Sequence, residues 1–332
     1  MARLNKTDLF HVLFDAFLQN TDSVYFAGGN NPYRFSFKDK FVNAFIVNVH
    51  FAGAGRSTSD EYRIQCPGHL PATLGNLRRQ GDRVFVLGFS SDLQAFSAWD
   101  PDRFLDRNPE AQRFSVYTRL SVMQEANAKG FSTYTDTNGQ NVIMFRPDLL
   151  GLYVENSTAL HQATTRTLRR IAEVYSNTPL GQPLVRPIRV NRQRIRVTRT
   201  EYSRSPRFRQ EVLRAYSHRC AMCEIQLDLV EAAHIVPHAH PKGFDTVSNG
   251  LALCALHHRS FDTGLLYVLR DYSIHLNSAK VRHLRKVGRA NGLRWYTRQL
   301  RPELLLPAYD DCLPEPDNLT LGNDLRGVGL EG

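Results

Sequence analysis

The first twenty residues place apolar side chains at helical spacing. The apolar positions of residues 3–19 recur at intervals of three and four, at Leu9, Phe10, Val12, Leu13, Phe14 and Phe17. This periodicity predicts an amphipathic helix with Thr7 as its N-cap. From residue 24 to residue 147 the pattern changes to short runs typical of strands, separated by Gly-, Asn- and Asp-rich turns. These runs predict a strongly curved or barrel-like sheet.

Helical spacing returns over residues 156–176, from a start near Ser157, and again over residues 206–219. A strand pattern then ends at Pro237, and a second one leads into a helix that carries His257, His258 and Asp262. The chain therefore has an α+β pattern: a mixed, strand-rich N-terminal domain followed by a small ββα domain.

Composition and linkers suggest where the domains divide. We expect an N-terminal domain over residues 1–180, a basic linker over 181–207, a second domain over 208–301 and an acidic, loosely ordered tail over 302–332. The chain has no run of eighteen apolar residues and no signal-peptide pattern, so a cytoplasmic location without membrane insertion is expected.

Four metal-binding side chains stand in two pairs. Cys220 and Cys223 form a C-x-x-C pair, and Cys254 with His257 forms C-x-x-H about thirty residues later. Two such pairs can close one tetrahedral site, so we predict a structural Zn²⁺. The other two cysteines, Cys66 and Cys312, are expected as unpaired thiols, in keeping with a reducing compartment.

A second group of polar residues lies between and after these pairs. His258 and Asp262 are four residues apart, so on a helix they share one face and can hold one cation together. His234, on the preceding strand, is then placed to take a proton from a water molecule beside that cation.

These residues resemble a known family. The segments A-H-I-V-P, N-G-L and L-C-x-x-H-H-x-x-F-D, within residues 208–270, are similar to the motif of HNH (ββα-metal) endonucleases. The resemblance implies that His234 is the general base, that Asn249 orients the strand and loop, and that His258 binds a catalytic Mg²⁺ or Mn²⁺. It also implies products with 5′-phosphate and 3′-hydroxyl ends.

The sequence departs from that family at one position. Many HNH nucleases carry Asp as a metal ligand directly before the base, whereas this chain has Ala233. We expect Asp262 to replace it, and Glu231 is the weaker candidate.

The charge is concentrated beside the proposed nuclease core. The net charge is +10, and two Arg-rich blocks, residues 185–220 and 267–301, flank the core. Basic residues in such blocks often form only a solvated face, but beside a phosphodiesterase they favour a clamp on a phosphate backbone. The candidate DNA contacts are Arg189, Arg192, Arg194, Arg196, Arg282, Arg285 and Lys286.

The sequence is most consistent with a restriction-type endonuclease that cuts double-stranded DNA. The architecture resembles bacterial restriction endonucleases in which an HNH domain is fused to a variable specificity domain, and dependence on modified cytosine is left open. Two alternatives remain: a zinc protein that binds DNA without cutting it, and a nonspecific nuclease switched on by a small ligand. One HNH site cuts one strand, so a homodimer is one route to a double-strand break.

The N-terminal half contains no recognisable catalytic motif. A domain that reads a base needs an aromatic wall and hydrogen-bonding side chains. The candidates beside turns are Asn30, Asn31, Tyr33, Arg34, Trp99, Asp100 and Tyr134.

Overall fold

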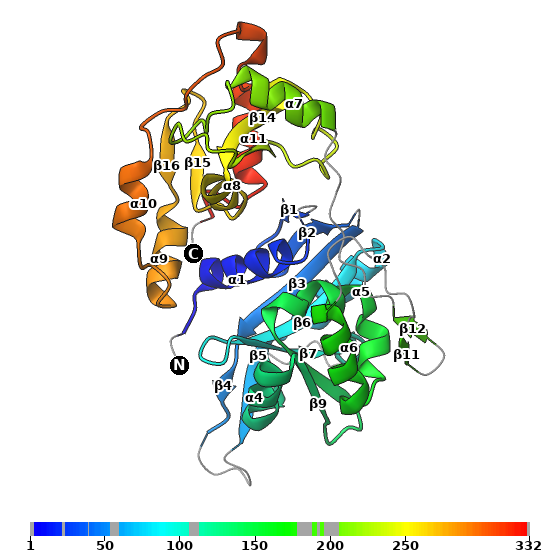
Figure 1. Cartoon of the computed structure of the whole chain (residues 1–332). Helices are drawn as coiled ribbons and strands as arrows, with labels where there is room; N and C mark the ends of the chain where they lie inside the picture. Colours follow the sequence, from blue (N-terminus) through cyan, green and yellow to red (C-terminus); the bar gives the residue numbers. More distant parts are fainter. Residues whose placement is uncertain are drawn as a thin grey trace. The chain divides into compact units, whose positions relative to one another are not determined.

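The computed structural model describes residues 3–21, 24–38, 40–53, 60–105, 113–177, 188–190, 193–195 and 206–330, and the chain divides into two compact units (Figure 1). Unit 1 comprises Met1–Thr21 and Gly28–Glu201, and unit 2 comprises Asp22–Ala27 and Tyr202–Gly332. The functional roles predicted for the two domains and for the basic linker stay predictions.

The larger sheet has seven strands in the order β1-β2-β3-β6-β7-β10-β9. Only β3 and β6 are paired in parallel among the described pairs. Its strands are β1 (Val24–Gly28), β2 (Tyr33–Phe37), β3 (Lys40–Asn48), β6 (Arg83–Ser90), β7 (Ala95–Trp99), β9 (Phe131–Thr135) and β10 (Asn141–Phe145).

A separate antiparallel sheet follows the order β4-β5-β8. It consists of β4 (His50–Phe51), β5 (Glu61–Pro67) and β8 (Arg113–Arg119). The alternating runs therefore form two open sheets, and the predicted barrel-like closure is wrong. Side chains of both sheets, including Ile64, Val86, Trp99 and Val116, share one buried cluster.

The first helix, α1 (Lys6–Leu18), forms as predicted but begins differently. Asn5, rather than Thr7, is the N-cap: its side chain accepts from the backbone N–H of Asp8, whose carboxylate accepts from the N–H of Asn5. The apolar face of α1 stacks Phe10 and Phe14 against Phe35 of β2.

The other helices of unit 1 cover its sheets or connect their strands. The long helix predicted over residues 156–176 is two helices, α5 and α6. The helices are α2 (Leu70–Arg79), α3 (Asp102–Leu105), α4 (Leu120–Lys129), η1 (Pro147–Leu149), α5 (Leu150–His161) and α6 (Thr165–Asn177). Two short strands, β11 (Ile188–Val190) and β12 (Gln193–Ile195), pair with each other.

Unit 2 is built around a ββα element. The strands β13 (Val230–His234) and β14 (Gly250–Cys254) pair antiparallel, and α8 (Ala255–Asp262) follows directly. The helix α7 (Pro206–Ala215) packs on this hairpin. A Cβ atom at Gly250 would lie 2.4 Å from Val212 of α7, so glycine permits the close approach.

Further elements complete unit 2. They are η2 (Val247–Asn249), β15 (Leu266–Val268), β16 (Ile274–Leu276), α9 (Ser278–Lys286), α10 (Leu293–Gln299), η3 (Asp310–Cys312) and α11 (Pro316–Asp324). No helix in the described ranges is long and apolar enough to cross a membrane.

The acidic C-terminal segment is ordered through residue 330, and the prediction of a loose tail is wrong there. Leu319 joins the core of unit 2, and the side-chain amide of Asn323 donates to the carbonyl of Val268. The acidic residues of α11 are exposed, whereas Leu304 and Leu319 of this segment are buried in the core of unit 2.

Candidate active site and metal centre

The predicted zinc ligands converge in unit 2. Cys220 and Cys223 lie in the loop after α7, Cys254 ends β14, and His257 lies in the first turn of α8. Nδ1 of His257 is 3.3 Å from Sγ of Cys254 and 3.5 Å from Sγ of Cys220. All four ligand atoms lie within 4.8 Å of one another, and none of the cysteines forms a disulfide.

The electrostatics of this cluster suit a cation. Hydrogen bonding from the Cys220 thiol, aided by His257, lowers the pKa of Cys254 to about 3. The same bond, together with burial, raises the pKa of Cys220. Thiolates are the metal-binding form of cysteine, and three sulfurs with one imidazole nitrogen make a Cys3His donor set. The cluster can therefore hold a metal ion such as zinc.

His234 ends β13 between an aromatic ring and a carboxylate. Its imidazole stacks on Phe208 of α7, with ring centroids 4.1 Å apart and planes inclined by 13°. Its Nε2 is 2.8 Å from Oδ1 of Asp245. Because an ionised carboxylate only accepts, Nε2–H of His234 is the donor, and Nδ1 then carries the lone pair of the neutral ring.

Asn249 fastens the chain just beyond His234. Its side-chain oxygen accepts from the N–H of Val236, and its amide donates to the carbonyls of Val236 and Phe244. The backbone carbonyl of Asn249 also accepts from the N–H of Ile235. The buried amide thus holds both ends of the loop that begins after His234.

His258 lies on α8 between two carboxylates. Its Nδ1 is 2.9 Å from Oε2 of Glu231, and its Nε2 is 3.3 Å from Oδ2 of Asp262. If Nδ1–H donates to Glu231, the lone pair of Nε2 faces a carboxylate oxygen. A proton on Nε2 or a cation between the two atoms would make this contact favourable, so the pair can supply two ligands to an ion.

A second donor group overlaps the proposed base. His234, His238 and Asp245 also bring three ligand atoms within 4.8 Å of one another. Asp245 is 2.8 Å from His234 and 3.4 Å from Nδ1 of His238. Here the imidazole N–H groups themselves can satisfy the carboxylate, so no cation is required.

The predicted DNA contacts are only partly described. Arg282, Arg285 and Lys286 lie exposed on α9. Arg189 and Arg194 lie on β11 and β12, but their side chains, like all of Arg192 and Arg196, lie outside the described residues.

The predicted base-reading residues of unit 1 are mostly structural. Trp99 is fully buried and donates to the carbonyl of Tyr117, which also accepts from the hydroxyl of Tyr134. Tyr33 donates to the carbonyl of Lys6, and burial raises the pKa of its hydroxyl to about 12. These three aromatic side chains do not form an exposed stacking wall, so that prediction is wrong for them.

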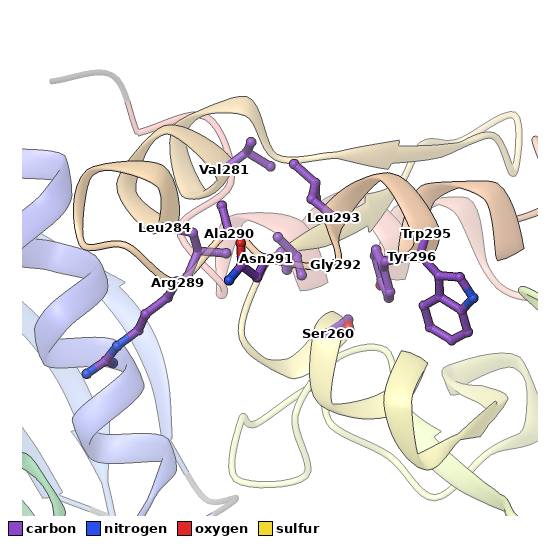
Figure 2. A pocket seen from close by; sticks show the side chains of 11 residues that line it. Ser260, Val281, Leu284, Arg289, Ala290, Asn291, Gly292, Leu293, Trp295 and Tyr296 are labelled. Atoms are coloured by element: carbon purple, nitrogen blue, oxygen red, sulfur yellow. The ribbon is translucent and has the colours of Figure 1, made fainter.

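One cavity of unit 2, of about 260 Å³, lies beside the metal cluster. Figure 2 shows Tyr296 directed toward Ser260 of α8, whereas Trp295 is turned outward. The ring of Tyr296 is 5.6 Å from that of His257, so α10 closes one side of the Cys3His cluster.

The sequence alone did not identify three neighbours of the site. Phe208, Asp245 and Arg326 touch His234 or its backbone, but each belongs to a different segment. His-Asp pairing of this kind has no fixed sequence spacing, so only the fold brings these residues together.

Comparison with known proteins agrees with this geometry. Residues 220–269 match the family described as HNH endonuclease, and residues 40–154 match the family described as Methylase-associated X1. The chain therefore carries an HNH endonuclease domain, and it is a nuclease.

Among the solved structures, one that matches is described as a modification-dependent TagI restriction endonuclease. It is 16% identical, with coverage of 86% of this chain and 83% of that chain and a TM-score of 0.27. This TM-score is too low to establish a common overall fold. A search of curated proteins found no match.

Proposed function

We propose that this protein is a restriction-type DNA endonuclease in which His234 is the general base. The observation that carries the proposal is the His234–Asp245 pair at the end of β13, within a ββα element that matches HNH endonucleases. Asp245 accepts from Nε2–H of His234 and thereby directs the basic nitrogen, Nδ1, toward a water molecule. A phosphodiester attacked by that water leaves the 5′-phosphate and 3′-hydroxyl ends expected of this family.

The second part of the proposal concerns the ions. Cys220, Cys223, Cys254 and His257 would hold Zn²⁺ as a structural ion, and His258 with Asp262 would hold Mg²⁺ or Mn²⁺. A hard divalent ion offsets negative charge that develops on a phosphodiester. We prefer His258–Asp262 to the His234–His238–Asp245 group, because an ion bound to His234 would occupy the lone pair that the base needs.

Glu231 takes a different role in this arrangement. It accepts from Nδ1 of His258, 2.9 Å away, rather than sharing the side where Asp262 lies. A carboxylate on the far nitrogen of a ligating histidine fixes its tautomer and ring orientation. We therefore propose Asp262 as a ligand and Glu231 as the residue that orients His258.

Target choice is assigned to unit 1. A family described as methylase-associated covers residues 40–154, and this supports a restriction role for the nuclease. Double-stranded DNA is the proposed substrate, cleaved in the cytoplasm, with a homodimer as one route to cutting both strands. The last part of the proposal is that cleavage depends on modified cytosine in the DNA.

Cleavage of supercoiled plasmid tests the base. We expect wild-type protein with Mg²⁺ or Mn²⁺ to nick or linearise a susceptible DNA. His234→Gln should cut at least about a hundredfold more slowly, the usual range for loss of a general base. The matched control is His238→Gln, which removes the neighbouring imidazole and should stay within about threefold of wild type. Equal loss in both variants would contradict His234 as the base.

The alternatives have their own signatures. A protein that only binds DNA would show salt-sensitive binding and no nick with any divalent metal. A ligand-gated nuclease would cut unmodified DNA only after the ligand is added.

A further inference from the structure

The C-terminal segment places one buried guanidinium against the backbone that carries the proposed base. Arg326 is 3% exposed and is the single basic residue among residues 302–332. Its Nη1 donates to the carbonyls of Ile235 and Gly322 at 2.6 and 3.0 Å. Its Nη2 donates to the carbonyl of His234 at 3.0 Å and lies 3.5 Å from Oδ1 of Asp262.

These contacts matter because β13 ends at His234. Beyond this residue the backbone leaves the ladder with β14, and its polar groups need other partners. The side chain of Asn249 bonds the backbone N–H and carbonyl of Val236. The guanidinium of Arg326 donates to the carbonyls of His234 and Ile235. Two buried side chains therefore hold three consecutive residues from different directions.

The packing around Arg326 fixes the guanidinium in turn. It lies over the ring of Phe261, with the guanidinium carbon 4.1 Å from the ring centroid. A Cβ atom at Gly322 would lie 2.5 Å from the carbonyl oxygen of Ile235, so glycine lets α11 approach the strand end. The buried charge has a carboxylate partner in Asp262, which compensates part of its desolvation cost.

We propose that Arg326 is a positioning residue that sets the geometry between the base and the ion-binding carboxylate. One guanidinium touches the backbone of His234 and the side chain of Asp262, so it fixes the spacing of the strand end and of α8. This inference rests on the proposed function of His234 and Asp262. It adds that the C-terminal segment is part of the catalytic architecture.

The test compares two Arg→Lys variants in the whole, zinc-loaded chain, at two arginines that each contact the C-terminal segment or belong to it. Arg326→Lys keeps the charge but cannot reach four acceptors with a planar fork. Arg270→Lys is the matched control, because Arg270 pairs with Asp317 at the surface of α11 and touches no proposed site residue. We expect Arg326→Lys to lower kcat about tenfold to a hundredfold with KM within about threefold, as for small misplacements of reacting groups. Arg270→Lys should cut like wild type.

A third variant distinguishes a positioning role of Arg326 from a purely structural one. Leu319→Ala removes a buried side chain of α11 without touching His234 or Asp262. It should lower Tm at least as much as Arg326→Lys while keeping kcat within about threefold, measured below both transitions. If Leu319→Ala loses as much kcat as Arg326→Lys, or if Arg326→Lys keeps its kcat, Arg326 has no positioning role.

A spectroscopic readout makes the test independent of cleavage. In protein labelled with ¹⁵N-histidine, the imidazole signals of His234, assigned with His234→Gln, should shift in Arg326→Lys and stay in place in Leu319→Ala. Gly322→Ala, which separates α11 from the strand while retaining Arg326, should shift them too. Unchanged signals in both would overturn the inference even if the protein cuts no DNA tested, whereas shifted signals without any cleavage would overturn only the nuclease proposal.

Discussion

His234 has two neighbours that act on its charge in opposite directions. The ring of Phe208 covers one face of the imidazole and excludes water, which disfavours a charged ring. Asp245 lies 2.8 Å from Nε2 and favours the imidazolium that forms once the base has accepted a proton. The carboxylate of Asp245 therefore has its largest effect after proton transfer, because it stabilises an imidazolium that Phe208 shields from water.

Replacing Asp245 with Asn tests that assignment. The amide keeps the size of the side chain but cannot stabilise the imidazolium as a carboxylate does, and it can also favour the wrong tautomer. We expect Asp245→Asn to lower kcat about tenfold to a hundredfold, part of the range for general base catalysis, with little change in KM. Steady-state nicking of plasmid DNA measures both constants.

The control for this substitution is Asp228→Asn. Asp228 is exposed just before β13 and has a positive φ of 59°, a conformation that Asn tolerates. This variant should behave like wild type. A kcat for Asp245→Asn within threefold of wild type would show that the carboxylate does not assist the base.

The sequence predicts those residues that lie close together in a motif. The four Cys and His residues form two pairs whose spacing is visible in the sequence, and these pairs converge in the structure. Asn249 bonds the backbone of Val236, and its role in cleavage stays a prediction. Arg326 follows His234 by 92 residues, and Asp245 reaches it from a loop. No local periodicity encodes such contacts, so only the folded chain reveals them.

At the scale of elements, the Cys3His cluster connects three parts of unit 2. It joins the loop after α7, the end of β14 and the start of α8, while Tyr296 of α10 packs against His257. The same segments also share the hydrophobic core of unit 2 and backbone hydrogen bonds such as Ala221 N–H to the carbonyl of Ala252, so an ion would add to these contacts. We expect an ion bound there to contribute folding energy to unit 2, because all four of its ligands belong to that unit.

Removal of the ion should affect the two units differently, and the two tryptophans of the chain report on each. Trp99 is buried in unit 1, and Trp295 lies on α10 of unit 2. In Trp295→Phe, a strong chelator should leave the emission of Trp99 in place. In wild-type protein the Trp295 contribution should change, and far-ultraviolet circular dichroism should show loss of helix.

Added Zn²⁺ should restore both signals if the loss is reversible. Cys223→Ala should behave like the chelated protein without chelator, whereas Cys312→Ala, outside the cluster, should not. Unchanged emission and helix content after proven metal loss would mean that the ion is not structural.

The elements themselves were predictable to different degrees. Short runs of strand-forming residues between turns identified most strands of unit 1, including β6 and β7, which are buried along most of their length, but these runs did not reveal how the strands divide into two sheets. That division depends on long-range pairing such as β5 with β8. The sequence predicted one helix in place of α5 and α6, because the break between them, after His161, contains no proline or glycine.

At the scale of the whole molecule, the proposed function assigns cleavage to unit 2 and target choice to unit 1. The proposed base and ion ligands all lie in unit 2, and in the proposed mechanism they act on the phosphodiester and its water rather than on a base. Selectivity must then come from other surfaces. Trp99, Tyr33 and Tyr134 serve the core of unit 1, which removes the most obvious stacking candidates there.

Two DNAs of identical sequence, one with methylated or hydroxymethylated cytosine, test whether unit 1 reads modification. A substituent at C5 of cytosine lies in the major groove, where one good contact is worth about 1–3 kcal/mol, or a factor of about 5 to about 160. We expect wild-type protein to cut the modified DNA faster by at least this factor, and His234→Gln to cut neither. The products are compared on one gel at equal protein, metal and salt, because binding to phosphates varies steeply with salt.

Preference for the unmodified DNA would instead indicate a nuclease whose target is protected by methylation. Equal rates on both would place target choice in sequence or shape and would contradict the modification-dependent part of the proposal.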